Sequence, residues 1–207
     1  MKHIDASLVP SGALDHRGVI WWGNLLLLVI ETTMFALLVA VYLYLRQNTE
    51  PWPPPRVQGG PPFVLDPNPS LLIPTINLFV LLVALVPTYL ADKAAHNLDW
   101  AGTLKWDALS LGLGWVAVVL RFFEFEALHF TWDENAYASI VWMILGVHLA
   151  HILVVLIEEG NTAVWVWRRG IDKKHALDMR VSTIYYYWVV GTWVLLYPLV
   201  YLLPRVI

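Results

Sequence analysis

Cysteine is absent from the 207 residues of this chain, and charged residues are scarce. Without cysteine, the chain cannot form disulfides, zinc–thiolate sites or cysteine-ligated iron–sulfur clusters. Only 14% of the residues are Asp, Glu, Lys or Arg, and the formal net charge is −3. No basic stripe is present, so the charge pattern gives no indication of nucleic-acid binding. Hydrophobic residues make up 58% of the chain and the mean hydropathy is +0.60, which is typical of an integral membrane protein.

The charge-poor segments are long enough to cross a membrane, which takes about 20 apolar residues in a helix. Four such segments are evident, at residues 19–45, 71–91, 136–158 and 183–203. We interpret 108–128 as a fifth span whose last turns carry charge, because Arg121 and Glu124 lie three residues apart on one helical face and could pair near the membrane interface. The predicted fold class is all-α: a polytopic membrane protein whose residues 19–207 form a single domain of five transmembrane helices.

The segments outside the spans predict the topology. The tail at residues 1–18 is polar and has no apolar core followed by a cleavage site, so we expect it to be retained. If the N-terminus is inside, the inner segments hold nine Lys and Arg residues and the outer segments hold four. The positive-inside rule therefore predicts a cytoplasmic N-terminus and a C-terminus on the opposite side of the membrane.

Two connecting segments have unusual compositions. The outer loop at residues 47–70 is rich in proline and glycine and cannot be helical. It is either a flexible linker or, through Trp52, Phe63 and Leu65, a segment that lies on a partner or on the membrane surface. The inner loop carries a basic cluster that includes Arg168 and Arg169, which either sets the topology or contacts phospholipid head groups.

A few polar residues interrupt the apolar spans. Glu31 lies near the middle of the first span, Asn77 lies in the second, and His148 and His151 lie near the middle of the fourth. The spacing of the two histidines places both imidazoles on one side of a helix. An ionised side chain at the centre of a span costs roughly 2.5–3.5 kcal/mol, so these residues require an explanation.

Three explanations are compatible with the residues. A metal or haem site could use Glu31, His148 and His151, but two histidines one turn apart cannot be opposed axial ligands, and no fourth intramembrane ligand is evident. A proton relay or transport site would need an entry path and more polar neighbours. We favour the third explanation, in which the groups satisfy one another across helices or bind lipid and so fix the packing. We assign no metal ligand and no catalytic residue.

The arrangement of these residues resembles subunit III of the haem–copper oxidases, the group of cytochrome c and quinol oxidases. The first span matches that family's third helix in one ungapped register, through Gly23, Glu31, Phe35, Ala36 and Tyr42. A longer ungapped stretch matches through Leu113, Gly114, Glu124, Phe130, Thr131, Tyr137, Ser139, Gly146, His148 and His151. The chain resembles the third to seventh helices of the common seven-helix form.

This resemblance implies a fold and a role. The five helices would form a bundle with a V-shaped cleft that holds phospholipid against subunit I, with Glu31, Asn77, His148 and His151 facing one another or the cleft. The chain itself would carry no haem, copper or quinone. Haem and copper would belong to the partner subunits I and II. The role would be that of a non-catalytic subunit that stabilises subunit I in a proton-pumping terminal oxidase of the bacterial plasma membrane.

The last helix departs from the family pattern. The family usually carries Y-W-H-F-V-D there, whereas this chain has Tyr187 in place of the histidine and Val190 in place of the aspartate. These changes keep open the alternative of an accessory subunit of a nitric oxide reductase. A membrane transporter or proton-relay protein is less favoured, because the five unequal spans show no internal repeat. The sequence leaves open whether the electron donor is cytochrome c or quinol, and where the two remaining family helices reside.

Overall fold

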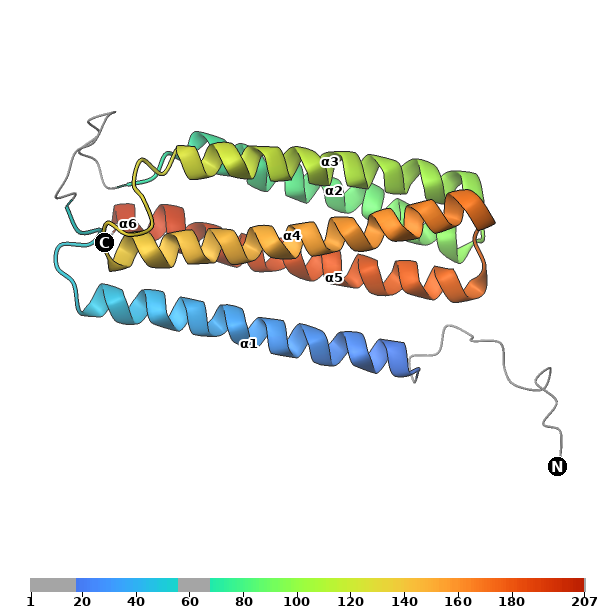
Figure 1. Cartoon of the computed structure of the whole chain (residues 1–207), viewed down its shortest axis with the longest axis horizontal. Helices are drawn as coiled ribbons and strands as arrows, with labels where there is room; N and C mark the ends of the chain where they lie inside the picture. Colours follow the sequence, from blue (N-terminus) through green and yellow to red (C-terminus); the bar gives the residue numbers. More distant parts are fainter. Residues whose placement is uncertain (1–17, 56–67, 207) are drawn as a thin grey trace, which may run out of the picture.

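A computed structural model describes residues 18–55 and 68–206 as an assembly of long helices (Figure 1). The elements are α1 (Val19–Gln47), α2 (Leu72–His96), α3 (Trp100–Glu126), α4 (Ala136–Arg169), α5 (Lys173–Tyr197), the π-helical segment η2 (Pro198–Leu202) and α6 (Leu203–Val206). The last three follow one another without a break. Five helical rods are therefore long and apolar enough to cross a membrane, which confirms the predicted number of spans.

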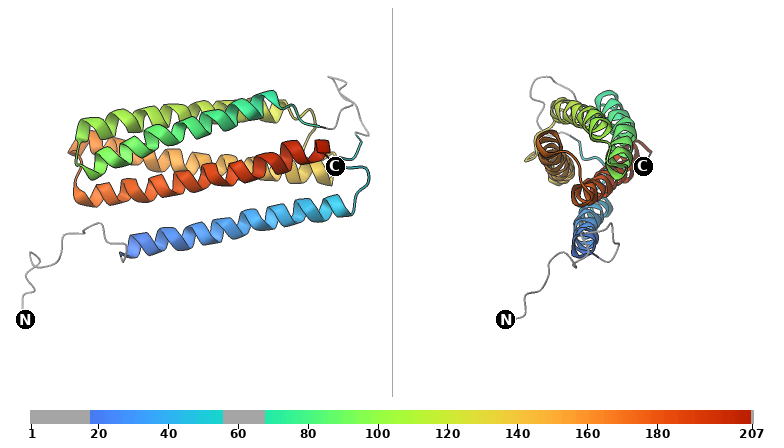
Figure 2. Two further views of the ribbon diagram at one scale, coloured as in Figure 1. Left: turned by 180° about the vertical axis from the view of Figure 1, so that it is seen from behind. Right: turned by 90° about the vertical axis from the view of Figure 1, so that its right-hand side faces the viewer.

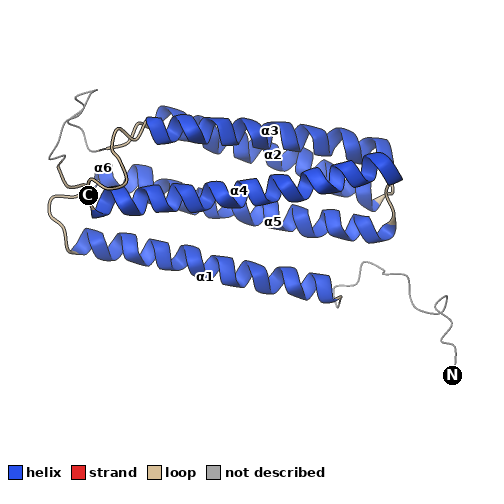
Figure 3. Cartoon of the chain, in the orientation of Figure 1, coloured by secondary structure: helices blue, strands red, loops and turns tan. Residues whose placement is uncertain are grey.

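Two predictions fall on residues outside the described ranges. These are the retention of the N-terminal tail and the placement of Phe63 and Leu65 in the proline-rich loop. Within the described residues all regular secondary structure is helical, and the connections are short turns and the ends of this loop (Figure 3).

The helices α2 to α5 pack together, and α1 lies along the outside of this group against α4 and α5 (Figures 1 and 2). The most extensive contact is between α2 and α3. In α1 only Phe35 and Tyr42 are buried. The core of the protein is thus a four-helix bundle, and most of the apolar surface of α1 faces away from it. We call the end of the bundle at Gln47, Leu72 and α6 the Trp52 end, and the end at His96 and Lys173 the Trp100 end.

Several helices extend beyond the apolar segments that identified them. Helix α3 begins at Trp100, well before residue 108, and α4 continues past residue 158 to Arg169. Capping residues set these limits: the Asp99 side chain accepts a hydrogen bond from Gly102 N (3.0 Å), and α4 ends before Gly170, which has a φ of +78°. Consequently, Asp107 and Glu159, which lie near the edges of the apolar segments, belong inside helices.

One face of α3 carries both polar and apolar buried residues. The buried positions are Thr103, Asp107, Ser110, Gly114, Ala117, Val118, Arg121 and Glu124. At Gly114 a Cβ atom would lie 2.3 Å from Leu156 Cδ2 on α4, so the glycine permits a close approach of the two helices. The apolar residues in the middle of this stripe separate two polar groups, one toward each end of the bundle.

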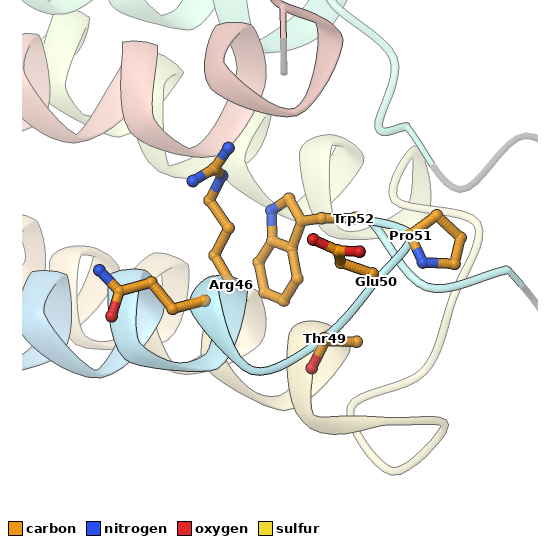
Figure 4. Close-up of a pocket in the computed structure, with 6 residues that line it drawn as sticks. Arg46, Thr49, Glu50, Pro51 and Trp52 are labelled. Atoms are coloured by element: carbon orange, nitrogen blue, oxygen red, sulfur yellow. The ribbon is translucent and has the colours of Figure 1, made fainter.

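The first part of the proline-rich loop folds back onto the chain. Trp52 donates a hydrogen bond from its indole nitrogen to the Tyr42 hydroxyl (3.4 Å), and its ring packs edge-on against the rings of Tyr42 and Tyr137. Trp52 therefore links α1 to α4 at the Trp52 end. A pocket of about 550 Å³ lies beside it, lined by Arg46, Gln47, Thr49, Glu50, Pro51 and Trp52 (Figure 4).

Candidate functional site

The ion pair between Arg121 and Glu124 is completely buried. Arg121 Nη1 lies 2.8 Å from a Glu124 carboxylate oxygen, and both side chains are fully shielded from solvent. The guanidinium group also lies 3.8 Å above the ring of Trp193 on α5, in a cation–π contact. The buried face of α3 turns this pair into the protein interior. Its position near the membrane interface stays a prediction.

Glu124 receives contacts from three elements. Besides the ion pair within α3, its carboxylate accepts a hydrogen bond from Asn77 Nδ2 on α2 (3.2 Å) and another from the Tyr201 hydroxyl on η2. The π-helical segment begins at Pro198, which has no N–H to donate, and it turns Tyr201 into the core. One carboxylate thus joins α2, α3 and the final rod.

His148 extends this network to α4 and α5. Its Nδ1 lies 3.1 Å from Arg121 Nη2 and its Nε2 lies 3.0 Å from the Val189 backbone oxygen. A guanidinium only donates and a carbonyl only accepts, so Nδ1 accepts and Nε2 carries the hydrogen. The ring also stacks on Trp193 at 4.6 Å between centroids. Both ring nitrogens of this fully buried histidine are therefore engaged within the chain.

His151 contacts a different element. Its Nδ1 lies 2.7 Å from the Val147 backbone oxygen and therefore donates to it, and its Nε2 lies 3.0 Å from Glu31 Oε2 on α1. With the ring hydrogen on Nδ1, the contact to Glu31 needs one further proton, carried either by the carboxyl group or by Nε2. The His151 and Glu31 side chains are 11% and 23% exposed. This pair lies at the edge of the bundle, and it is a direct polar link between α1 and α4.

The structure separates the two histidines that the sequence groups together. Residues three apart on an α-helix differ in direction by about 60°. This rotation is enough for His151 to face Glu31 on α1 while His148 faces Arg121 on α3. Of the four residues expected to form one group, Asn77 and His148 join the Arg121–Glu124 network, and Glu31 and His151 form a separate pair.

An apolar groove lies next to the Glu31–His151 pair. It has a volume of about 160 Å³ and is lined by residues of α1 and α5: Thr32, Phe35, Ala36, Val39, Thr192, Leu195 and Leu196. The Phe35 ring, which lines this groove, also packs on the His151 ring at 5.1 Å. Trp188 Nε1 donates to Thr32 Oγ1 (2.9 Å) and so joins α5 to α1 at this level. The lining suits a hydrocarbon chain better than a polar ligand.

The basic residues Arg168 and Arg169 lie elsewhere, at the Trp100 end. Both are exposed in the last turn of α4, where positive charge is favourable to the helix dipole. Arg169 lies 5.5 Å from the Trp165 ring. Next to them, Asp172 caps α5, and the hydrogen bond from His175 N (2.8 Å) lowers the pKa of the Asp172 carboxyl group. These arginines make no contact with the polar network.

Sequence reasoning missed Trp193 and Tyr201, which complete the network around Arg121 and Glu124. Aromatic residues are abundant in this chain, so neither stood out. It also missed a second polar group that includes Asp107 and Glu159 on facing sides of α3 and α4. Asp107 and Ser110 are three residues apart and therefore share one side of a helix, which could have revealed this group. They lie at the very start of the predicted span, and the sequence analysis did not single them out.

The two substituted positions of the last helix have different surroundings. Val190 is 1% exposed and belongs to the apolar core, whereas Tyr187 is 36% exposed. Among the described residues, no group of three or more His, Asp or Glu side chains is arranged to hold a metal ion.

Comparisons with known proteins give a consistent result. The family model described as cytochrome c oxidase subunit III matches residues 13–204. Cytochrome c oxidase subunit 3 of Thermostichus vulcanus is 28% identical over 187 residues, which cover 88% of this chain and 87% of that protein. The corresponding subunit of Synechocystis sp. is 25% identical over 205 residues, covering 97% and 84%. Cytochrome bo(3) ubiquinol oxidase subunit 3 of Pseudomonas aeruginosa is 23% identical over 194 residues, covering 92% and 88%.

Proposed function

The chain belongs to the cytochrome c oxidase subunit III family, and from this membership we propose that it works as the non-catalytic third subunit of a respiratory haem–copper oxidase. The observation that carries the proposal is the family match over residues 13–204, which spans all five membrane helices. In such a complex, electrons pass to O₂ and protons are pumped. The relatives include subunits named for both cytochrome c and ubiquinol oxidases, so the electron donor stays open.

The redox cofactors belong, in this proposal, to the partner subunits I and II. The bonding of the intramembrane histidines supports this assignment. In His148, one ring nitrogen contacts Arg121 and the other contacts Val189. In His151, one contacts Val147 and the other contacts Glu31. A haem or copper ligand needs a nitrogen lone pair directed at the metal, and either histidine would have to give up a contact within the chain to supply it.

The role of the chain is to hold a rigid membrane surface against subunit I and to bind phospholipid. Support for the lipid site comes from the groove between α1 and α5. Its residues Thr32, Ala36 and Val39 follow a helical stripe that reaches Arg46 two turns later, in the pocket beside Trp52 (Figure 4). We place an acyl chain in the groove and its anionic head group at Arg46. The V-shaped cleft and a head-group role for Arg168 and Arg169 remain predictions.

We place the protein in the bacterial plasma membrane, with its N-terminus in the cytoplasm. It is an integral membrane protein by its five apolar helices. The distribution of Lys and Arg supports an inner location for the Trp100 end and an outer location for the Trp52 end. Subunits from Synechocystis and Bacillus are among its relatives, which supports a bacterial location.

The proposal is tested by replacing the residues that join α1 to the bundle. Glu31→Ala and His151→Ala should each lower the thermal stability of the purified complex and reduce the phospholipid that purifies with it, because α1 loses its polar link to α4. The haem and copper content should stay unchanged.

Asp133→Asn, in an exposed loop position, is the control and should alter none of these properties. The isolated subunit should be analysed in parallel for visible absorption and metal content. A stoichiometric haem or transition metal on this chain would contradict the proposal.

A further inference from the structure

A second buried polar group lies in the half of the bundle nearer the Trp100 end. We call it the Glu159 cluster, and it consists of Thr88 on α2, Asp107 and Ser110 on α3, Glu159 on α4 and Tyr186 on α5. Each of the five side chains is at most 3% exposed. Asp107 and Tyr186 are both close enough to Glu159 to interact with it electrostatically. The cluster has no role in the function proposed above.

The hydrogen bonds of this cluster can be counted. Thr88 Oγ1 lies 2.8 Å from the Ala84 backbone oxygen and 2.7 Å from Ser110 Oγ, and Ser110 Oγ lies 3.4 Å from each carboxyl oxygen of Glu159. These three contacts share only two hydroxyl hydrogens, because a carbonyl oxygen can only accept. A hydrogen on the Glu159 carboxyl group completes the series: Glu159 donates to Ser110, Ser110 to Thr88 and Thr88 to Ala84. An ionised Glu159 leaves one contact without a hydrogen.

The charges around the cluster lead to the same protonation state. Among the described residues, Asp107 and Glu159 form no ion pair, and two arginines of the packed helices have other partners: Arg180 pairs with Asp92 (2.9 Å) and Arg121 with Glu124. Within the described residues, both oxygens of Asp107 have no hydrogen-bond partner, although they are buried. Two neighbouring carboxylates without a cation repel each other strongly in the low dielectric of a protein interior, and protonation removes this repulsion.

We propose that Asp107 and Glu159 form a proton-binding site in the membrane, in which Glu159 is protonated at neutral pH and donates to Ser110. The pair then carries at most one negative charge, on Asp107. The apolar residues Gly114, Ala117 and Val118 separate this site along α3 from the Arg121–Glu124 network. This inference rests on the packing of α2 to α5 and does not depend on the proposed oxidase role.

Infrared spectroscopy of the purified complex at neutral pH tests the proposal, because a protonated carboxyl group has a carbonyl stretch that a carboxylate lacks. Comparison of the wild type with Glu159→Gln should show the loss of one such band. Glu126→Gln replaces an exposed carboxyl group at the far end of α3 and should leave that band in place.

A second variant keeps the test decisive if Glu159→Gln fails to assemble. Ser110→Ala removes the proposed acceptor and should shift the Glu159 band to higher frequency without abolishing it. A spectrum in which neither variant changes a protonated-carboxyl band would overturn the proposal. A band that develops only after removal of bound metal cations would also overturn it, since the carboxylates would then form a cation site.

Discussion

At the scale of single residues, Glu124 is a carboxylate that joins three elements of the fold. It contacts Arg121, Asn77 and Tyr201, which lie on α3, α2 and η2. A buried ion pair adds little net stability compared with an apolar pair, because both charges lose their hydration. Removal of one partner is much more costly, because the other charge is left buried and unpaired. The network therefore fixes the arrangement of the helices more than it increases their stability.

Glu124→Ala should destabilise the protein by about 3–5 kcal/mol, because it leaves Arg121 uncompensated in the core. The effect can be measured as a fall in the thermal stability of the purified complex. Glu126→Gln is the matched control on the same turn of α3, where the side chain is exposed, and should change little. An equal effect of the two substitutions would show that Arg121 does not depend on Glu124.

At the scale of helices, contacts between elements depend on a few small residues and caps. Helices α3, α4 and α5 each begin with a residue whose side chain accepts a hydrogen bond from the first turn: Asp99, Asn135 and Asp172. The close approach of α3 and α4 depends on Gly114. Both features were open to sequence analysis in principle, since caps have recognisable residue types, but the facing residue Leu156 is known only from the packed structure.

Gly114→Ala should destabilise the bundle by about 1–3 kcal/mol, because the added methyl group overlaps the buried Leu156 side chain. Gly112→Ala is the control on the same helix, where an added Cβ meets nothing within 4 Å. Combining Gly114→Ala with Leu156→Ala should cost less than the sum of the two single changes, as judged by thermal unfolding. Strict additivity would argue against the contact.

Asp172→Ala should lower stability by about 1 kcal/mol at neutral pH, through the loss of the cap of α5. The hydrogen bond from His175 N lowers the pKa of Asp172 in the folded state, so this contribution is present above the unfolded-state pKa and is lost as the pH falls through the folded-state pKa. The difference from the wild type in thermal unfolding should therefore shrink under acidic conditions. Lys174→Ala, at an exposed position of the same turn, should show no such pH dependence.

At the scale of the whole molecule, the protein is a four-helix bundle with one peripheral helix. Helix α1 touches α4 and α5 along one side and exposes large apolar residues elsewhere, among them Leu26, Val29 and Leu37. Such a surface is compatible with lipid or with another membrane subunit. The odd number of spans places the start of α1 and the end of α6 at opposite ends of the molecule (Figure 1).

The topology can be tested without background labelling, because the chain has no cysteine. Asp133→Cys places a thiol in the exposed α3–α4 connection at the Trp52 end, and Lys174→Cys places one at the Trp100 end. In intact cells, a membrane-impermeant thiol reagent should label the first variant and not the second, because the positive-inside rule predicts that the basic Trp100 end faces the cytoplasm. The opposite labelling pattern would show that the protein is inverted.

The sequence by itself determined the membrane class, the five helices and some of the buried ionisable residues, among them Glu124 and His148. Each of these follows from a local property: the length of an apolar segment or the position of an ionisable residue within it. The register of Glu31, Glu124, His148 and His151 also led to the family. These features could be predicted because the apolar interior of a membrane requires a long apolar segment in every helix that crosses it.

The tertiary structure alone decided which polar groups meet. It assigned His148 to Arg121 and His151 to Glu31, it placed the Arg121–Glu124 pair in the protein core, and it brought Asp107 near Glu159. Partners of this kind lie far apart in sequence, and a rotation of about 60° between helical positions three residues apart changes the facing element. Local patterns contain no information on that rotation, which is fixed only when the helices pack.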